Sequence, residues 1–252
     1  MNRTVFITGA TSGIGKACAE KFAAGGDNLI LNGRRGDRLS DLQNFLQNKF
    51  TVKIFTSVFD VQHKEEVFDA INNLPDVWKD IDILINNAGL ALGRDFFDEA
   101  DLDDWETMMQ TNVNGLLYVT RAVLPFMTKK NSGHIINLGS VAAKEMYEKG
   151  NIYCASKAAV DAISKTMRID LLQHRIKVTA IHPGAVETEF ALVRYKGDTS
   201  KAADTYKGYK PLSADDIAET IYYTASLPSH VCINDLVITA ISQADAIYFK
   251  KD

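Results

Sequence analysis

The chain has 252 residues, 46% of them hydrophobic, and a formal net charge of −4. This is enough for a substantial core, and we expect a single domain spanning residues 1–252. The acidic balance and the lack of a long basic run argue against nucleic acid as a partner, and no apolar run is long enough to span a membrane. The N-terminal residues lead directly into a strand, so we expect no signal or transit peptide.

The cysteines Cys18, Cys154 and Cys232 are far apart in the sequence and show no metal-ligand spacing. An odd number of scattered cysteines is typical of reduced thiols. We therefore expect a cytoplasmic protein without disulfides.

Strand-like and helix-like stretches alternate along the whole chain, and we find no repeat or linker. This alternation predicts a doubly wound α/β fold, with a seven-stranded parallel sheet and helices on both faces. The expected strands are 4–7, 28–32, 52–55, 81–85, 133–138, 176–181 and 236–239. The expected helices are one directly after the first strand and its turn, then 37–48, 65–72, 103–127 and 152–172. Ligands bind such sheets beyond the carboxyl ends of the strands, so the residues just after each strand are the most informative.

A Gly-rich stretch, 8–15, follows the first strand and precedes a helix. This context is typical of a dinucleotide-binding loop, because glycines let the backbone approach a pyrophosphate and the helix N-terminus supplies free N–H groups. The spacing is G-x-x-x-G-x-G and not the usual G-x-G-x-x-G, so a Gly-rich turn without a ligand is the alternative. The predicted cofactor-binding residues here are Gly9, Thr11, Ser12, Gly13, Ile14 and Gly15.

The second strand is followed by Gly33, Arg34 and Arg35. An NAD site normally places a carboxylate near this point to bind the ribose 2′-hydroxyl. Arginine instead suits a phosphate, by charge and by its planar fork of donors. We therefore predict NADP as the cofactor, bound by Arg34 and Arg35. The alternative, a solvated arginine pair at a helix start, is disfavoured by the helix dipole unless an anion is present.

Polar or small residues also follow the third, fourth and sixth strands. Asp60 is placed to accept from an adenine amine, or else to cap the next helix. The sequence N-N-A-G at 86–89 suits a close approach to a ribose, with a polar turn as the alternative. His182 is expected to be a packing or turn residue, neither a base nor a metal ligand. The predicted cofactor-binding residues are Asp60, Val61, Asn87, Ala88, Gly89, Pro183, Gly184, Val186 and Thr188.

Tyr153 and Lys157 are four residues apart in an expected helix, so their side chains share one face. A nearby ammonium favours the phenolate and lowers the pKa of a tyrosine. Such a phenol can exchange a proton with an alcohol or a carbonyl oxygen. Ser140, at the end of the fifth strand, is placed to hold the same oxygen by a hydrogen bond.

Together these motifs resemble the short-chain dehydrogenase/reductase family, in the family's order and over nearly the whole chain. The resemblance implies a Rossmann-type fold, a nicotinamide cofactor and hydride transfer without a metal. It further implies that Tyr153 is the acid/base, that Ser140 polarises the substrate, and that Lys157 binds the ribose and lowers the pKa of Tyr153. Asn112 matches the asparagine that holds a proton-relay water, whereas its sequence context alone indicates an ordinary polar helix residue.

The last third, at 187–190, 193–198 and 227–234, is similar to the NADP-dependent 3-hydroxy acid (serine/allo-threonine) dehydrogenase branch. This similarity implies a homotetramer that oxidises the β-hydroxyl of short hydroxy acids or reduces the matching carbonyl compounds. The charged segment 144–149 departs from that branch, which bears on the substrate and not on the chemistry.

Residues 185–210 form a polar, Gly-containing insertion that is long enough to be a lid over the substrate. Two of its cations, Arg194 and Lys196, are candidates to hold a carboxylate. We predict that Arg194 binds the substrate and that Lys196 is solvated.

Two other functions stay open. One is an NADPH-dependent reductase of a bulkier ketone or β-ketoacyl compound, against which the lid length and the charged segment 144–149 argue. The other is a non-enzymatic NADP-binding sensor, which has no need of the combination of Ser140, Tyr153 and Lys157.

Overall fold

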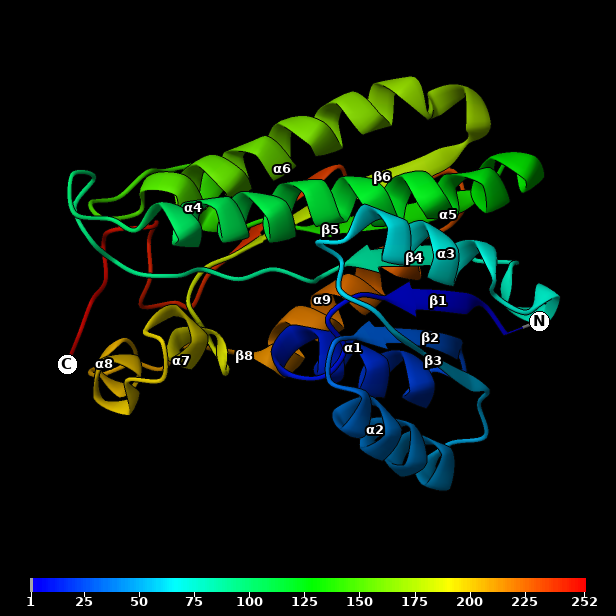
Figure 1. Cartoon of the computed structure of the whole chain (residues 1–252), viewed down its shortest axis with the longest axis horizontal. Helices are drawn as coiled ribbons and strands as arrows, with labels where there is room; N and C mark the ends of the chain where they lie inside the picture. Colours follow the sequence, from blue (N-terminus) through cyan, green and yellow to red (C-terminus); the bar gives the residue numbers. More distant parts are fainter. Residues whose placement is uncertain (1) are drawn as a thin grey trace.

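The computed structural model describes residues 2–252 and is built around one large parallel sheet. Its strands are β1 (Thr4–Ile7), β2 (Asn28–Gly33), β3 (Ile54–Val58), β4 (Ile83–Asn86), β5 (Gly133–Leu138), β6 (Ile176–Pro183) and β9 (Asp235–Ile238). They lie in the order β3-β2-β1-β4-β5-β6-β9 (Figure 1). The direction of winding reverses between β1 and β4, and this is where such sheets bind ligands. The predicted doubly wound, seven-stranded fold is confirmed.

Helices cover both faces of the sheet (Figure 1). Alternate residues of β1 enter different cores: Val5 and Ile7 pack on one face, whereas Phe6 packs on the other. This follows from the two-residue period of a strand, and burial on both faces explains why β1 is apolar throughout. One face carries α1 (Gly13–Ala24), α2 (Gly36–Lys49) and α9 (Ala214–Ala225), and the other carries α3 (Lys64–Asn72), α5 (Leu116–Lys130) and α6 (Asn151–Asp170).

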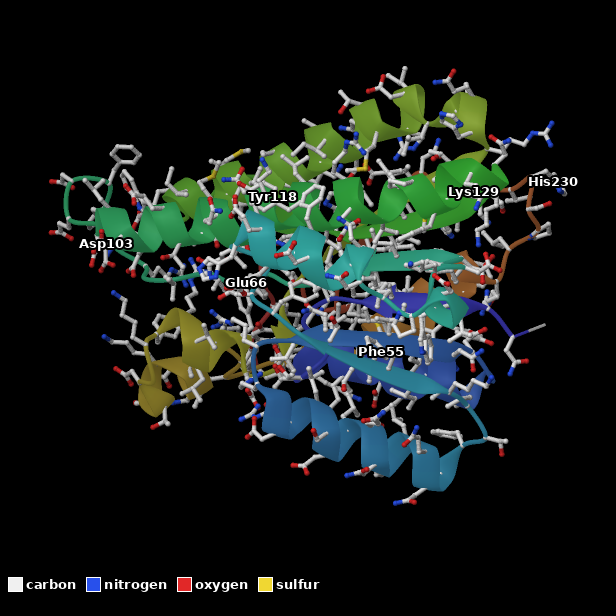
Figure 2. The ribbon with its side chains drawn as sticks, turned by 45° about the vertical axis from the view of Figure 1, so that its right-hand side comes forward. Phe55, Glu66, Asp103, Tyr118, Lys129 and His230 are labelled. Carbon is white, nitrogen blue, oxygen red and sulfur yellow. The ribbon has the colours of Figure 1, made fainter. Side chains whose placement is uncertain are left out.

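The expected helix 103–127 is a longer and irregular rod. It consists of α4 (Leu102–Met109), a π-helical segment (Gln110–Gly115) and α5. Figure 2 labels Asp103 near its beginning and Lys129 near its end, and the rod runs across the molecule beside α6. A single π-helical turn is too short to alter the hydrophobic pattern of the rod, so the sequence did not reveal it.

Two other differences concern the ends and number of elements. The third strand begins at Ile54 and not at residue 52, because the Lys53 N–H is taken by the side chain of Asn28 at 3.0 Å and pairing with β2 starts at Ile54. Helix α9 was not predicted. It begins with a capping box in which the Ser213 hydroxyl accepts from Asp216 N at 3.2 Å and the Asp216 carboxylate accepts from Ser213 N at 2.8 Å. This S-x-x-D pattern was a usable signal.

The insertion 185–210 contains two short helices, α7 (Phe190–Arg194) and α8 (Thr199–Asp204). Two short strands, β7 (Val186–Glu187) and β8 (Leu212–Ser213), pair at its base. The insertion lies beyond the carboxyl ends of the sheet strands (Figure 1) and touches the connection between β4 and α4, where Gly93 N donates to Arg194 O at 2.9 Å. Its action as a lid, like the single-domain organisation, stays a prediction. Within residues 2–252, no helix is both long and apolar enough to cross a membrane.

Candidate active site

A cavity of about 340 Å³ lies at the carboxyl ends of the strands, around the switch point between β1 and β4. It brings together residues that follow six different strands. Of the predicted site residues, only Gly15, Asn112 and Arg194 are outside its lining. The predicted residues that line it are Gly9, Thr11, Ser12, Gly13, Ile14, Arg34, Arg35, Asp60, Val61, Asn87, Ala88, Gly89, Ser140, Tyr153, Lys157, Pro183, Gly184, Val186 and Thr188.

The Gly-rich loop has the geometry of an anion-binding turn. Gly9 and Gly13 have φ angles of +65° and +52°, which glycine adopts without strain. A Cβ at Gly15 would overlap Gly9 O and the Asn87 side chain. As far as the described residues go, α1 has no side-chain cap at Ser12 and no acidic residue in its first turn. Its free N–H groups and positive dipole end therefore fit the pyrophosphate of a dinucleotide.

Asn87 braces this loop. Its Nδ2 donates to Thr8 O at 2.8 Å and to Gly9 O at 3.1 Å. The Thr8 hydroxyl in turn accepts from Asn87 N and Ala88 N, both at 3.0 Å. Asn87 is thus more than a polar turn residue, because it ties the ends of β1 and β4 together; the contact predicted between the 86–89 segment and a ribose stays a prediction.

The two predicted phosphate-binding arginines both line the cavity, but they are held differently. Arg34 pairs with Asp60 across 3.2 Å. Arg35 donates to the hydroxyls of Thr11 and Ser12, at 2.7 and 3.0 Å. Asp60 is not a helix cap, because α3 begins at Lys64 and Asp60 instead accepts from Gln62 N at 3.1 Å.

Glu189, which was not predicted from the sequence, also lines the cavity, beside Arg35 and Arg38. Its carboxylate accepts from Arg38 at 2.9 and 3.0 Å and lies 3.4 Å from Arg35 Nη1. Although partial burial acts in the opposite direction, the Arg38 and Arg35 guanidiniums hold the pKa of this carboxyl below its usual value. The start of α7 is therefore fastened to the arginine-rich start of α2.

The acid/base candidates meet at the other end of the cavity. Tyr153 and Lys157 lie on one face of α6 and are almost fully buried. The Ser140 hydroxyl lies close enough to the Tyr153 phenol to act on its pKa. The Ser140 hydroxyl accepts from Ala142 N at 3.1 Å, and Lys157 Nζ donates to Leu138 O at 2.8 Å. The structure thus brings the three predicted residues together.

Burial governs the protonation of this group. It raises the pKa of Tyr153 well above its usual value, with the Ser140 hydroxyl and the Arg194 guanidinium acting in the opposite direction. Burial also lowers the pKa of Lys157 to about 8. Both shifts follow from the cost of an isolated charge away from water. The expected lowering of the Tyr153 pKa by Lys157 is therefore not seen, because desolvation is the largest effect on the phenol.

Comparison with known proteins identifies the family. Residues 3–197 match the family model described as short chain dehydrogenase. The chain is a short-chain dehydrogenase. It is 44% identical to the NADP-dependent 3-hydroxy acid dehydrogenase of Salmonella typhi over 96% of both chains, and 44% identical to sulfoacetaldehyde reductase 2 of Chromohalobacter salexigens over 97% of this chain and 96% of that one.

A solved structure, the closed form of serine dehydrogenase complexed with NADP+, is 43% identical. It superposes with a TM-score of 0.92, covering 96% of this chain and 97% of that one. The predicted family and branch resemblance are thus confirmed. These relatives also agree with the prediction of NADP as the cofactor.

Asn112 lies in the π-helical segment of this short-chain dehydrogenase, behind the cavity. Its amide pairs with the main chain of Leu90, accepting from N and donating to O, both at 2.8 Å, and donates to Ser156 at 3.0 Å. It joins the segment after β4 to helix α6, which carries Tyr153. Its function in a proton relay stays a prediction.

The two cations of the 185–210 insertion are also placed differently. Arg194 lies with its guanidinium carbon 5.4 Å from the Tyr153 ring centre, and it donates to the Tyr147 hydroxyl at 2.9 Å. Lys196 is exposed and pairs with Asp104 across 2.8 Å. Arg194 is therefore next to Tyr153, whereas Lys196 forms a surface ion pair with Asp104 of α4.

Proposed function

We propose that this chain is an NADP(H)-dependent oxidoreductase that interconverts a short 3-hydroxy acid and the matching carbonyl compound. The observation that carries the proposal is the joining of Ser140, Tyr153 and Lys157 to a Gly-rich, arginine-flanked cradle in one cavity. The family and the names of the relatives support the same reaction. When bound, the nicotinamide supplies or accepts the hydride.

The chain's own residues position the substrate and move the proton. Ser140 holds the substrate oxygen, and Tyr153 Oη gives it a proton in reduction or takes one from it in oxidation. Because burial keeps the phenol protonated at neutral pH, the site is set for proton donation to a carbonyl. Lys157 stands one helical turn from Tyr153 to bind the ribose of the cofactor.

Arg194 supports an anionic substrate. It is partly buried, lies against the rings of Tyr147 and Tyr153, and is anchored by Tyr147 and by Gly93 O at 3.3 Å. An anchored guanidinium beside the acid/base group suits a small substrate with a carboxylate at its far end. A sulfonate offers similar chemistry, which agrees with the sulfoacetaldehyde reductase among the relatives.

Purified protein should oxidise a short hydroxy acid with NADP+. The panel comprises L- and D-serine, allo-threonine, 3-hydroxyisobutyrate, 3-hydroxypropionate and 2-hydroxyethanesulfonate, followed by absorbance of the reduced cofactor. We expect Tyr153→Phe to lower kcat by about 10²–10⁴-fold, because it removes the proton-transferring hydroxyl. NADPH binding, measured by fluorescence, should be kept. Substantial residual turnover in this variant would show that Tyr153 is not the acid/base.

Silence of the wild-type protein across that panel, with NADPH still bound, would exclude the short hydroxy acid. Bulkier ketones would then be tested with NADPH. Failure of those as well would leave a non-enzymatic NADP-binding sensor.

Arg34→Ala should weaken NADPH binding by about tenfold, the loss expected for one charge-assisted hydrogen bond at an exposed site. NADH binding should change little, because NADH lacks the 2′-phosphate. The matched control is Arg38→Ala, which removes a guanidinium that pairs with Glu189 and does not line the cavity. Titration of each variant with both cofactors checks this prediction; equal losses for NADPH and NADH would remove the phosphate-binding assignment of Arg34.

Arg194→Gln should raise KM for the anionic substrate by about tenfold, because the carboxylate loses its cationic partner. A neutral alcohol that lacks the carboxylate should be turned over equally well by variant and wild type. The control is Lys196→Gln, which removes a lid cation that pairs with Asp104 outside the cavity. An unchanged KM in Arg194→Gln would exclude this residue from substrate binding.

We further propose a homotetramer in the cytoplasm. Cys18, Cys154 and Cys232 are free thiols, which suits a reducing compartment.

Leu102 and Met109 on α4 and Leu117 on α5 are exposed apolar side chains on the helical rod, a surface that suits helix–helix assembly into the tetramer. Light scattering should give the mass of four chains, and Leu117→Glu should lower it; a monomeric wild-type protein would contradict the proposal.

A further inference from the structure

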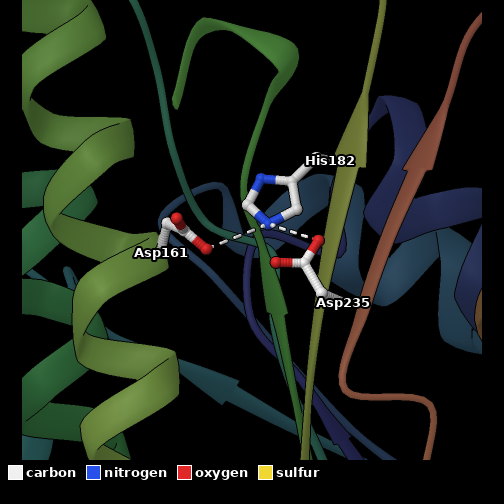
Figure 3. A group of neighbouring side chains, drawn as sticks. All are labelled: Asp161, His182 and Asp235. Atoms are coloured by element: carbon white, nitrogen blue, oxygen red, sulfur yellow. Dashed lines mark ion pairs between the residues drawn. The ribbon is translucent and has the colours of Figure 1, made fainter. Parts of the chain in front are cut away.

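A cluster of ionisable groups lies next to Ser140, at the end of β6 and the beginning of β9. Figure 3 shows the ring of His182 between the carboxylates of Asp161 and Asp235. His182 is fully buried, and its Nε2 lies 3.5 Å from Asp161 Oδ1 and 3.6 Å from Asp235 Oδ1. Lys144 Nζ bridges the same two carboxylates, at 3.0 Å from Asp161 and 2.7 Å from Asp235. Among the described residues, Nε2 of His182 makes no hydrogen bond.

The ligand atoms of Asp161, His182 and Asp235 lie within 4.8 Å of one another, a spacing that a metal ion would accept. However, the ammonium of Lys144 already donates to both carboxylates and supplies the positive charge that they need. Asp161 Oδ2 also accepts from Lys165 at 2.7 Å. We therefore treat the cluster as an ion network and ask what it holds in place.

The network joins the two segments that carry the acid/base group. Asp161 lies four residues beyond Lys157 and eight beyond Tyr153, on the same face of α6. Lys144 ends the short turn Val141–Ala143, for which Ser140 is the N-cap. The ion pair between Lys144 and Asp161 therefore fastens the Ser140 segment to the Tyr153 helix.

His182 holds the other end of that segment. Its Nδ1 lies 3.4 Å from Ser140 N and 3.2 Å from Ser140 O. A Cβ at Gly139 would overlap the imidazole ring, so only glycine lets the ring approach the main chain this closely. The Ser140 main chain and the imidazole are thus fitted to each other.

We propose that His182 is a positioning residue, which sets Ser140 against Tyr153 and does so in one protonation state. This inference rests on the proposed function of Ser140 and Tyr153. Because Nε2 faces two carboxylates, it carries the proton of the neutral ring, and Nδ1 accepts from Ser140 N–H. A second proton goes to Nδ1, which then donates to Ser140 O and leaves the N–H without its acceptor. Protonation of His182 in acid therefore changes the position of Ser140.

The charges that face the ring set the direction of each effect. Burial and Lys144 lower the pKa of His182, and Asp235 and Asp161 raise it. The neutral, productive ring is therefore kept at neutral pH and lost as the pH falls. Removing Lys144 favours the charged ring, whereas neutralising Asp235 disfavours it.

The test uses His182→Ala and His182→Asn in the full chain. His182→Ala should lower kcat about tenfold while KM and NADPH binding stay near wild type, because only the position of Ser140 changes. His182→Asn, whose amide can accept from Ser140 N–H but cannot titrate, should restore most of kcat and remove the loss of activity in acid. The control is His134→Asn, a buried histidine bonded to Thr179 on β6, away from Ser140. A wild-type kcat in His182→Ala, or an acid limb that persists in His182→Asn, would overturn the proposal.

Two further variants act from outside the ring, in case the buried changes impair folding. Lys144→Met should move the acid limb of kcat to higher pH, and Asp235→Asn should move it to lower pH. Shifts in the same direction would contradict the proposed titration of His182.

An experiment without turnover separates this proposal from the proposed function. In protein labelled with ¹⁵N-histidine, the ring signals that disappear in His182→Asn should show a neutral ring protonated at Nε2 at pH 7. A ring protonated at Nδ1, or a charged ring, would overturn the inference even if the enzyme is active. The expected tautomer in a protein without turnover would uphold the network and reject only the enzymatic function.

Discussion

The hydrogen bonds between the ends of β1 and β4 are the constraint on which the rest of the site depends. Asn87 donates two of them to Thr8 and a third to Gly9 O, and the Thr8 hydroxyl accepts a fourth from Ala88 N. Each such bond is worth only about 1 kcal/mol in stability. Their larger effect is geometric, because they draw the Gly-rich loop over the switch point and leave room for no side chain at Gly15. The other strand ends are parallel neighbours of this pair, so they meet around the cavity that it defines.

Helix α6 places Tyr153 and Lys157 in the lining of that cavity from one of its faces. Tyr153 and Lys157 are both buried, and burial disfavours the charged form of each. The group is therefore held as a neutral acid near a weakly basic amine. Deeper along the same face, Asp161 is ionised, because although burial acts in the opposite direction, Lys165 and Lys144 hold its pKa below the usual value. One helix thus places a neutral phenol, Tyr153, and a charged carboxylate, Asp161, eight residues apart, and the ion pair of Asp161 with Lys144 joins the helix to the segment that follows Ser140.

Strand ends explain why so much of the site could be predicted. The carboxyl ends of parallel strands converge, so a residue such as Ser140 needs only a correctly predicted strand to be placed beside Tyr153. Side chains whose contacts are with other side chains could not be predicted from the strand ends in this way. His182 reads as a packing residue at a strand end, and nothing local shows that Asp235, more than 50 positions later, faces its ring. Asn112 could be found only through the family resemblance, because the single π-helical turn that carries it is too short to change the hydrophobic pattern.

The arginine-rich start of α2 shows where an argument from sequence is incomplete. Basic residues at a helix N-terminus are unfavourable unless an anion is nearby, and the anion predicted from the sequence was a cofactor phosphate. The structure shows that the chain supplies two anions of its own, since Asp60 pairs with Arg34 and Glu189 pairs with Arg35 and Arg38. Three guanidiniums against two carboxylates still leave an excess of positive charge, and this excess favours a 2′-phosphate over a hydroxyl. Because Glu189, the N-cap residue of α7, pairs with Arg35, a phosphate bound by Arg34 and Arg35 would share one arginine with the start of that helix.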